Sequence, residues 1–397
     1  MQCNPVPERD RWTFYEAIKI EFIMEIIIVG GGAAGYQAAL HCRKCWPKKS
    51  VTLIEAEGEV GYCRPLLPQL MSGQVTEEKL FLWKPGEDSH LQVRTGVRVQ
   101  SLDRESQSLV LENRERIKYE RLILAAGGRP FVPRLAGAEG LKGIFPVRNL
   151  PDAKKAHDWL AKDQTIGVLG GGLVGVKTAV DLRVAGFRVS IVEREDHLLP
   201  QALAPKAARV VEAHFGRMGI GLFFGATVEH IEGERGAITA VKVSGQRLPC
   251  DSLLVATGAT PNISFLEGSG LLENGKLLVS PALQTRDPRI FAAGDAVTIA
   301  FPDGKTLTPW TWPQAVSQGK LAAENLYRPS LLHLKTLTRV NSMNLSGLSL
   351  AMLGAAVEGA KEIGCARPDE GIFRQAFLQS GRLAGGALLG DISGAGP

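Results

Sequence analysis

The sequence predicts an α/β fold with two Rossmann-like dinucleotide-binding units and a smaller α+β unit at the C-terminus. Two segments carry the first part of this prediction: IIIVGGGAAGYQAAL at residues 26–40 and IGVLGGGLVGVKTAV at residues 166–180. Each is an apolar run that ends in spaced glycines and continues as a helix-like run. From Leu331 onward the sequence instead resembles short strands, and Gln379–Arg382 is expected to form a hairpin turn.

Both glycine segments lie in the context of a βαβ unit. Strands are expected at residues 25–29 and 165–169, and each runs into the spacing Gly-x-Gly-x-x-Gly. A helix follows, and then a second strand that ends in an acid, Glu55 in the first unit and Glu193 in the second. The combination of strand, glycines, helix and acid is the dinucleotide-binding fingerprint, which is far more specific than the glycines alone.

The residue types explain why this fingerprint suits a dinucleotide. The first glycine permits a tight turn, the second leaves room for a pyrophosphate, and the third lets the helix and the strand pack closely. The N–H groups at the helix N-terminus face the phosphates, and the acid accepts hydrogen bonds from a ribose. These glycines are Gly30, Gly32 and Gly35 in the first unit and Gly170, Gly172 and Gly175 in the second.

The composition argues against several other classes of protein. The net charge is +5 over 397 residues, without a basic tract that contains aromatics, so no nucleic-acid partner is predicted. No stretch reaches the roughly 18 apolar residues of a membrane-spanning helix. The six cysteines are scattered. They predict neither a disulfide framework nor a metal site, and a reducing cytoplasm is the expected location.

Further motifs extend the pattern: AAGGRP at 125–130, ATGATPN at 256–262 and FAAGD at 291–295. Together with the two glycine sets and their acids, this order resembles the pyridine nucleotide–disulfide oxidoreductase superfamily, the flavoproteins with two dinucleotide-binding domains. The resemblance covers about residues 24–390. It implies that the first unit binds FAD, that the second binds NAD(P)H and is inserted in the first, and that a C-terminal interface domain follows.

The resemblance also implies domain boundaries. We expect an N-terminal extension at 1–23, an FAD-binding domain in two parts at 24–148 and 255–328, an NAD(P)-binding domain at 149–254, and a C-terminal domain at 329–397. The extension is interpreted as an N-terminal arm or as an over-long gene model that should start at Met24, and the second interpretation is favoured. The C-terminal domain is shorter than in relatives, so either a partner chain completes it or the sequence is a fragment.

The FAD contacts implied by the resemblance lie in both parts of the first domain. Glu55 is expected to bind the adenosine ribose, Arg129 to lie near the adenosine end, and Arg64 to lie beside the flavin. Asp295 is expected to accept a hydrogen bond from a ribityl hydroxyl, and the helix at 312–323 to face the flavin ring. The expected FAD contacts are Gly30, Gly32, Ala33, Ala34, Gly35, Glu55, Arg64, Pro65, Ala126, Gly127, Arg129, Gly294, Asp295, Pro313 and Gln314.

The contacts with the pyridine nucleotide are expected in the second unit. Glu193 would repel the 2′-phosphate of NADPH, so NADH is favoured as the co-substrate. Arg194 directly follows it and could offset this repulsion, which makes NADPH the less favoured alternative. The expected NAD contacts are Gly170, Gly172, Leu173, Val174, Gly175, Glu193 and Gly258.

The cysteines differ from those of the disulfide-reducing members, which carry a C-x4-C pair near the flavin. Here Cys63 is the only thiol in the stretch GYCRPLLPQLM, two positions before the single-cysteine site of other relatives. A redox role for Cys63 is therefore an alternative to a plain loop cysteine. Cys42 and Cys45 lie three residues apart in the first helix and are interpreted as packing residues rather than metal ligands.

Without a dithiol, electrons must leave the flavin by another route. Some members of the superfamily pass electrons from the flavin to another protein without a dithiol. This sequence most resembles those members: the NADH-dependent rubredoxin, ferredoxin and nitrite reductases and the epsilon subunit of phenylglyoxylate dehydrogenase. The resemblance implies an FAD-dependent NAD(P)H oxidoreductase that exchanges electrons with an iron–sulfur or rubredoxin-like protein, either as a free enzyme or homodimer or as the flavin subunit of a larger complex. The alternatives are an NADH oxidase or coenzyme A-disulfide reductase-like enzyme that uses Cys63, and a non-enzymatic redox-sensing flavoprotein.

One more departure concerns the surroundings of the flavin. Ferredoxin-reductase-like relatives pair a lysine on the flavin-side helix with a glutamate two residues after the third glycine of the second set. In this sequence the two positions are Gln69 and Lys177. Lys177 is therefore the candidate catalytic residue, as a cation that neutralises the reduced flavin or contacts the nucleotide phosphates. The alternative is that it merely exchanges one polar contact for another.

Overall fold

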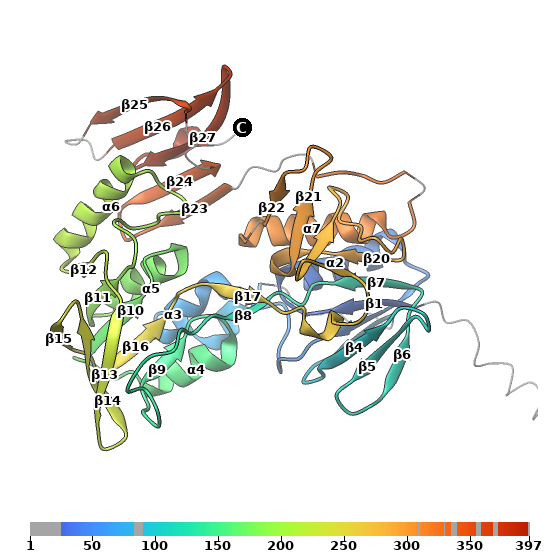
Figure 1. Ribbon diagram of the computed structural model, residues 1–397, viewed down its shortest axis with the longest axis horizontal. Helices are drawn as coiled ribbons and strands as arrows, with labels where there is room; N and C mark the ends of the chain where they lie inside the picture. The colour runs from blue at the N-terminus through green and yellow to red at the C-terminus, as the bar shows by residue number, and fades with distance from the viewer. Residues whose placement is uncertain are drawn as a thin grey trace, which may run out of the picture.

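The computed structural model describes residues 25–82, 90–308, 310–328, 330–334, 340–354, 359–367 and 372–395. The expected N-terminal extension lies outside these residues. Two units, each built on a five-stranded parallel sheet, form the body of the molecule, and smaller sheets complete it (Figure 1). The α/β fold class predicted from the two glycine segments is confirmed.

The first sheet has the strand order β20-β7-β1-β2-β3. Its strands are apolar runs such as Ile26–Ile28, which are fully buried because both faces of a parallel sheet are covered. The strand order reverses between β1 and β7, and such a switch opens a crevice at the carboxyl ends of the strands. The strands are β1 (Glu25–Val29), β2 (Ser50–Ile54), β3 (Leu91–Arg94), β7 (Arg121–Leu124) and β20 (Ile290–Ala292).

The second sheet has the order β12-β11-β10-β16-β9 and reverses between β10 and β16. Because β20 pairs with β7 but follows the whole second unit in the chain, the second unit is inserted in the first, as expected. The strand β9 lies on the N-terminal side of the expected boundary at residue 149, and that boundary stays a prediction. The strands are β9 (Ile144–Pro146), β10 (Thr165–Leu169), β11 (Arg188–Val192), β12 (Gly221–Phe223) and β16 (Ser252–Val255).

The helices pack on the sheets and on one another. In the first unit α2 and α7 lie side by side, so close that a Cβ atom on Gly319 would be 2.0 Å from the carbonyl oxygen of Ala34 (Figure 1). The short helix α3 precedes the second unit in the chain, yet it packs against α4 and α5 of that unit. The α-helices are α2 (Ala33–Cys45), α3 (Leu67–Met71), α4 (Leu150–Trp159), α5 (Leu173–Val184), α6 (Pro205–Met218) and α7 (Trp312–Asn325).

Several smaller elements connect and extend the two units. Two segments that link the units pair with each other as β8 (Gly128–Pro130) and β17 (Ala259–Pro261). Three further sheets are β4 (Val99–Asp103), β5 (Ser108–Leu111) and β6 (Arg116–Lys118); β13 (Val228–Glu234), β14 (Ala237–Val243) and β15 (Gln246–Pro249); and β18 (Leu272–Glu273), β19 (Lys276–Val279), β21 (Val297–Ala300) and β22 (Thr306–Leu307). Short 3-10 helices are η1 (Arg64–Leu66), η2 (Glu77–Leu80), η3 (Ser264–Leu266), η4 (Gly294–Ala296) and η6 (Ser393–Ala395).

The C-terminal unit is a five-stranded antiparallel sheet that lies over the second unit (Figure 1). The expected hairpin is confirmed, because Gln379 and Arg382 close the turn between β26 and β27. Leu350 and Leu389 of this sheet share a buried core with α3 and the second unit. The strands, in the order β23-β24-β27-β26-β25, are β23 (Val340–Asn344), β24 (Ser349–Gly354), β27 (Arg382–Leu389), β26 (Ile372–Gln379) and β25 (Lys361–Arg367).

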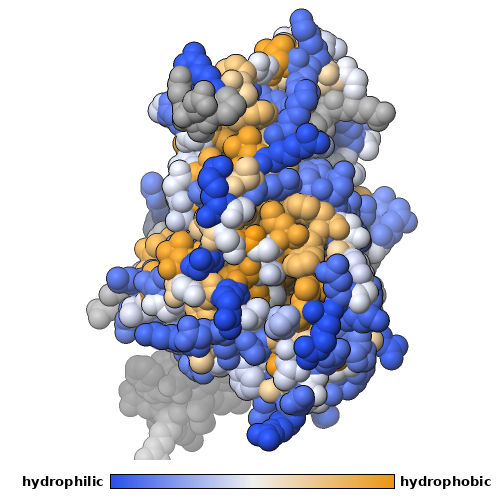
Figure 2. Space-filling view, turned by 90° about the vertical axis from the view of Figure 1, so that its left-hand side faces the viewer, coloured by the Kyte–Doolittle hydropathy of each residue, from blue (hydrophilic) through white to orange (hydrophobic). Residues whose placement is uncertain are grey.

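The molecular surface on the side of the second unit is uneven in polarity. Apolar side chains gather over the centre of this face, interrupted and surrounded by hydrophilic ones (Figure 2). Exposed apolar surface of this kind is typical of protein–protein contact sites. Within the described ranges, no helix combines the length and the apolar character that a membrane crossing requires.

Candidate active site

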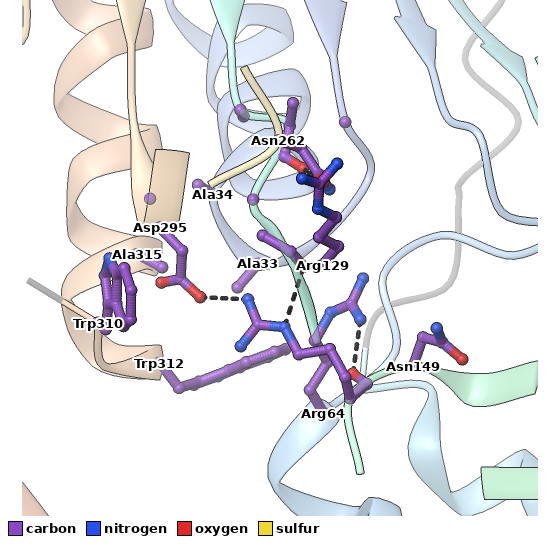
Figure 3. Close-up of a pocket in the computed structure, with 18 of the residues that line it drawn as sticks. Ala33, Ala34, Arg64, Arg129, Asn149, Asn262, Asp295, Trp310, Trp312 and Ala315 are labelled. Carbon is purple, nitrogen blue, oxygen red and sulfur yellow. Dashed lines mark hydrogen bonds and ion pairs between the residues drawn. The ribbon is translucent and has the colours of Figure 1, made fainter. Parts of the chain in front are cut away.

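A cavity of about 970 Å³ lies between the first unit and the second. Its walls come from the turn between β1 and α2, from β4, α3 and β8, and from the N-terminal ends of α5 and α7, and β23 completes them. Figure 3 shows side chains from several of these elements converging on the same space. The cavity therefore joins residues that are far apart in the sequence and that belong to both nucleotide-binding units.

The two glycine turns have the same geometry, each at the switch point of its sheet. Gly30 has a φ of 103° and Gly170 a φ of 107°. A Cβ atom on Gly30 would lie 2.2 Å from the carbonyl oxygen of Ala125, and one on Gly170 would lie 2.6 Å from that of Ala256. Both positions therefore require glycine, because the backbone is left-handed and the neighbouring strand comes too close for a side chain.

Glu55 directly follows β2, and the residue is 8% exposed. The Gly31 N–H donates to Oε2, and the Glu57 N–H donates to Oε1 at 2.8 Å. Burial raises the pKa of Glu55, and the two backbone donors oppose that rise. Each carboxylate oxygen keeps a further lone pair, so the group can still accept hydrogen bonds from ribose hydroxyls.

Glu193 is held in the second unit as Glu55 is held in the first. The Gly171 N–H donates to Oε2 at 2.5 Å and the Glu195 N–H donates to Oε1 at 2.9 Å. Glu193 as a whole is likewise 8% exposed. The neighbouring Arg194 is exposed, and its Nη2 pairs with the carboxylate of Glu195 at 2.9 Å. The second unit therefore repeats the two backbone hydrogen bonds that orient the acid of the first unit.

Arg64 is fixed at the wall of the cavity by three contacts. Its Nη2 donates to Glu57 Oε1 at 2.8 Å, and its Nη1 donates to the carbonyl oxygen of Arg148 at 2.7 Å. The guanidinium also lies 5.0 Å from the centre of the Tyr62 ring. Glu57 compensates the charge, so Arg64 presents a rigid, hydrogen-bonding edge to the cavity rather than a mobile cation.

Arg148 and Asp295 form an ion pair inside the cavity, with Nη2 2.5 Å from Oδ2 (Figure 3). Arg148 Nε also donates to the carbonyl oxygen of Gly128 at 3.1 Å. Sequence reasoning missed Arg148 and its neighbour Asn149. The available signal was the start of α4, because Asn149 accepts a hydrogen bond from the Asp152 N–H at 2.8 Å and so caps that helix.

Lys177 reaches the cavity from the first half of α5, together with Leu173 and Val174. Its Nζ donates to Oδ1 of Asp181, one turn further along the same helix. The Asp181 side chain is 6% exposed and that of Lys177 is 23% exposed. The partner of Lys177 is therefore a carboxylate on its own helix.

No cysteine is found among the described residues that line the cavity. Cys63 is buried beside it, and burial raises the pKa of its thiol, opposed by a hydrogen bond from the Leu66 N–H. Burial also raises the pKa of Cys42, and the Cys45 side chain is partly exposed. In the described part of the chain, His, Cys, Asp and Glu form no group of three that could hold a metal ion.

The cavity brings together most of the expected FAD contacts: Gly30, Gly32, Ala33, Ala34, Glu55, Arg64, Pro65, Ala126, Gly127, Arg129, Gly294 and Asp295. The expected residues outside its lining are Gly35, Gly170, Gly172, Gly175, Glu193, Gly258, Pro313 and Gln314. Lining residues that sequence reasoning did not assign include Arg98, Arg148, Asn149, Trp310, Trp312 and Asn341–Asn344. The assignment of single residues to a nucleotide stays a prediction.

The cavity fits the chemistry of FAD. The N-terminus of α2, which has no acidic residue in its first turn, opens onto the lining and can receive a diphosphate. Apolar walls such as Leu67, Trp312 and Met343 suit a flat ring system. Basic side chains outnumber acidic ones in the lining: Arg64, Arg98, Arg129, Arg148 and Lys177 against Glu55, Glu57 and Asp295.

Two dinucleotide-binding units that both line one cavity are typical of a flavin- and pyridine nucleotide-dependent oxidoreductase. The chain belongs to the pyridine nucleotide-disulphide oxidoreductase family, whose sequence model matches residues 24–319. Membership implies FAD as the cofactor and a pyridine nucleotide as the co-substrate, as the sequence predicted.

Proteins of known activity resemble this chain along most of its length. An NADH oxidase of Methanocaldococcus jannaschii is 30% identical over 317 residues, which cover 76% of this chain and 70% of that protein. A rubredoxin-NAD(+) reductase of Alcanivorax borkumensis is 30% identical over 301 residues, which cover 75% and 77%. The solved structure of a covalent putidaredoxin reductase–putidaredoxin complex matches with a TM-score of 0.85 at 25% identity, and it covers 92% of this chain and 89% of that one.

Proposed function

We propose that this protein is an FAD-dependent NADH oxidoreductase that exchanges electrons with an iron–sulfur or rubredoxin-like protein. The proposal rests on one observation about the cavity. Both nucleotide-binding units line it, and none of the described residues in its lining is a cysteine. Bound FAD supplies hydride acceptance from a reduced pyridine nucleotide and release of electrons one at a time. A disulfide relay is then unnecessary, and a redox protein is the natural recipient.

The residues of the chain supply binding, orientation and charge. Glu55 would hold the adenosine ribose, and the α2 N-terminus would hold the diphosphate. Asp295 would accept a hydrogen bond from the ribityl chain, and Arg64, fixed by Glu57, would bound the flavin end. Lys177 would place a positive charge near the ring, where it favours the reduced state.

We propose NADH rather than NADPH as the reductant. Glu193 is buried at the end of β11 and oriented by two backbone donors, which suits the two hydroxyls of an unmodified ribose. Its negative charge opposes a 2′-phosphate. Arg194 could bind such a phosphate, but its guanidinium pairs with Glu195. The acidic surroundings therefore favour NADH.

The redox partner is proposed on the relatives and on charge. One relative is a rubredoxin-NAD(+) reductase, and one similar solved structure holds putidaredoxin reductase bound to putidaredoxin. The net charge of +5 favours an acidic partner. We also propose a cytoplasmic location, which the free cysteines among the described residues favour. Action as a homodimer or as the flavin subunit of a larger complex is compatible with the same site.

The oxidase alternative has one observation in its favour, the NADH oxidase among the relatives. In its Cys63-dependent form it needs a thiol that reaches the flavin. Cys63 is 7% exposed and is not part of the cavity lining. The protein-acceptor function is therefore the better supported of the two.

An electron-transfer assay tests the proposal. The purified protein, loaded with FAD, is reduced with NADH or NADPH under nitrogen, and then oxidised rubredoxin or a [2Fe–2S] ferredoxin is added in a stopped-flow mixer. The proposal expects faster reduction by NADH and reoxidation by at least one of the two proteins. If oxygen reoxidises the flavin rapidly and neither redox protein increases the rate of reoxidation, the result would instead support an oxidase.

A further inference from the structure

Asp181 is a buried carboxylate that the proposed function does not use. Its Oδ1 accepts the hydrogen bond from Lys177 Nζ, and its Oδ2 has no hydrogen-bond partner. Asp181 lies on α5, which packs against α3, and its backbone carbonyl accepts a hydrogen bond from Gln74 Nε2 at 2.5 Å. A buried carboxylate with one unpartnered oxygen is costly, so its charge depends strongly on Lys177.

The pair is poorly explained as a device that stabilises the helix. Lys177 precedes Asp181 by one turn, with the cation nearer the N-terminus of α5 and the anion nearer the C-terminus. Each charge then faces the less favourable end of the helix dipole, and this order is the weaker one for an i, i+4 pair. A role at the cavity accounts for the arrangement better.

The position of the pair along the cavity indicates what it acts on. Glu55, which follows β2, and Val99 of β4 line the cavity from the first unit, whereas Lys177 lines it from α5 of the second unit. If Glu55 binds the adenosine ribose and the α2 N-terminus binds the diphosphate, the rest of the dinucleotide extends toward α3, α5, α7 and β23. Lys177 then stands at the end that receives the reacting ring.

We propose that Lys177 and Asp181 form a coupled charge pair that sets the midpoint potential of the bound flavin. The positive charge of Lys177 stabilises the negative charge that reduction adds to the ring. The carboxylate of Asp181 partly cancels that positive charge and holds the ammonium group in place. Asp181 is thus a positioning residue that acts through Lys177. The inference rests on the proposed function, because it requires FAD in this cavity.

The two members of such a pair must act with opposite sign. Lys177→Gln removes a cation that lines the cavity and should lower the midpoint potential. Asp181→Asn keeps an oxygen that can accept from the ammonium group but removes the offsetting charge, and should raise the potential. A tenfold change in the preference for reduced over oxidised FAD corresponds to a shift of about 30 mV for two electrons. The double variant should lie between the single ones.

The experiment measures the potential of FAD bound to the full-length protein by equilibration with redox dyes. Lys177→Arg keeps the positive charge and should keep the wild-type midpoint potential. Lys162→Gln, at an exposed position, controls for the loss of one positive charge anywhere on the protein. Should Lys177→Gln fail to fold, Asp181→Asn and Lys177→Arg still carry the test. The affinity for NAD+ is measured in the same variants.

The outcomes separate this inference from the proposed function. A shift of the two single variants in the same direction, or no shift in either, overturns the coupled pair. A weaker affinity for NAD+ in Lys177→Gln with an unchanged potential also overturns it, since Lys177 would then bind the nucleotide. If the wild-type protein holds FAD that NADH reduces, the proposed function stands in all these cases. A wild-type protein that binds no FAD overturns both.

Discussion

Asp295 and Arg148 meet across the cavity, with the carboxylate Oδ2 2.5 Å from the guanidinium Nη2 (Figure 3). Asp295 follows a strand of the first sheet, whereas Arg148 lies two residues before α4, a helix of the second unit. About a fifth of each side chain is exposed, so the pair is accessible from the cavity. The pair therefore connects the two units at the place where the ribityl chain of FAD is proposed to bind.

Asp295→Asn should weaken FAD binding about tenfold, as expected for loss of a hydrogen bond to a charged group. It removes the proposed acceptor for the ribityl hydroxyl and leaves Arg148 without its ionic partner. The dissociation constant is measured from the quenching of flavin fluorescence when the apoprotein is titrated with FAD. Asp303→Asn is the matched control, because Asp303 pairs with Lys305 and is not among the residues that line the cavity. Equal affinity of Asp295→Asn and wild type would remove Asp295 from the site.

Gly172→Ala should preserve the fold but impair the use of NADH. Gly172 has a φ of −75°, and a Cβ atom there would meet no protein atom within 4 Å. The substitution should therefore change the free energy of unfolding by less than about 1 kcal/mol. The added methyl group would occupy the place proposed for the pyrophosphate, so KM for NADH should rise at least about tenfold while FAD is retained.

Gly170→Ala is the matched control for that variant. The left-handed backbone and the 2.6 Å approach to Ala256 should make this substitution strongly destabilising in the absence of any ligand. Thermal unfolding separates the two effects. A Gly172→Ala protein with the wild-type KM would show that the pyrophosphate lies elsewhere.

Glu193→Gln should shift the preference between the two pyridine nucleotides. The substitution removes the charge that repels a 2′-phosphate and leaves Arg194 beside the site. We expect the ratio of kcat/KM for NADPH to that for NADH to rise about tenfold, mainly through KM. Glu234→Gln, at an exposed position on β13, controls for the change in net charge. An unchanged ratio would mean that Glu193 does not contact the ribose.

Cys63 should react slowly with alkylating reagents and should be dispensable. Burial raises the pKa of its thiol, so at pH 8 less of it is thiolate than in an ordinary cysteine, and only the thiolate attacks. Iodoacetamide should therefore label the exposed Cys365 before Cys63, as mass spectrometry of the intact and digested protein can show. Cys63→Ser should keep the wild-type rate of electron transfer. A loss of activity in this variant would support the thiol-dependent alternative.

Much of the fold could be predicted because its signals are local. Each glycine set, its helix and its acid lie within one βαβ unit, and the structure repeats the geometry in both units: Gly30 against Ala125, and Gly170 against Ala256. The insertion of the second unit came from the resemblance to a family, since no local pattern shows that β20 pairs with β7.

The parts of the site that sequence reasoning missed depend on contacts between distant segments. Arg148 has no characteristic spacing to Asp295, and β23 contributes to the cavity only because the C-terminal sheet lies over the second unit. The partner of Lys177, Asp181, follows it by four residues in the sequence. The family pattern instead predicted a pairing between the positions of Lys177 and Gln69. Asp181 became recognisable only when its burial was known.

The number of electrons that the protein accepts from NADH tests the central claim most directly. The FAD-loaded protein is titrated with NADH under nitrogen, and flavin absorbance and NADH consumption are followed together. A flavin without a redox-active thiol partner takes up two electrons, so the account predicts one NADH for each FAD, with full bleaching at that point. Consumption of two NADH for each FAD would reveal a second two-electron centre, such as a disulfide or an oxidised cysteine, and would contradict the account.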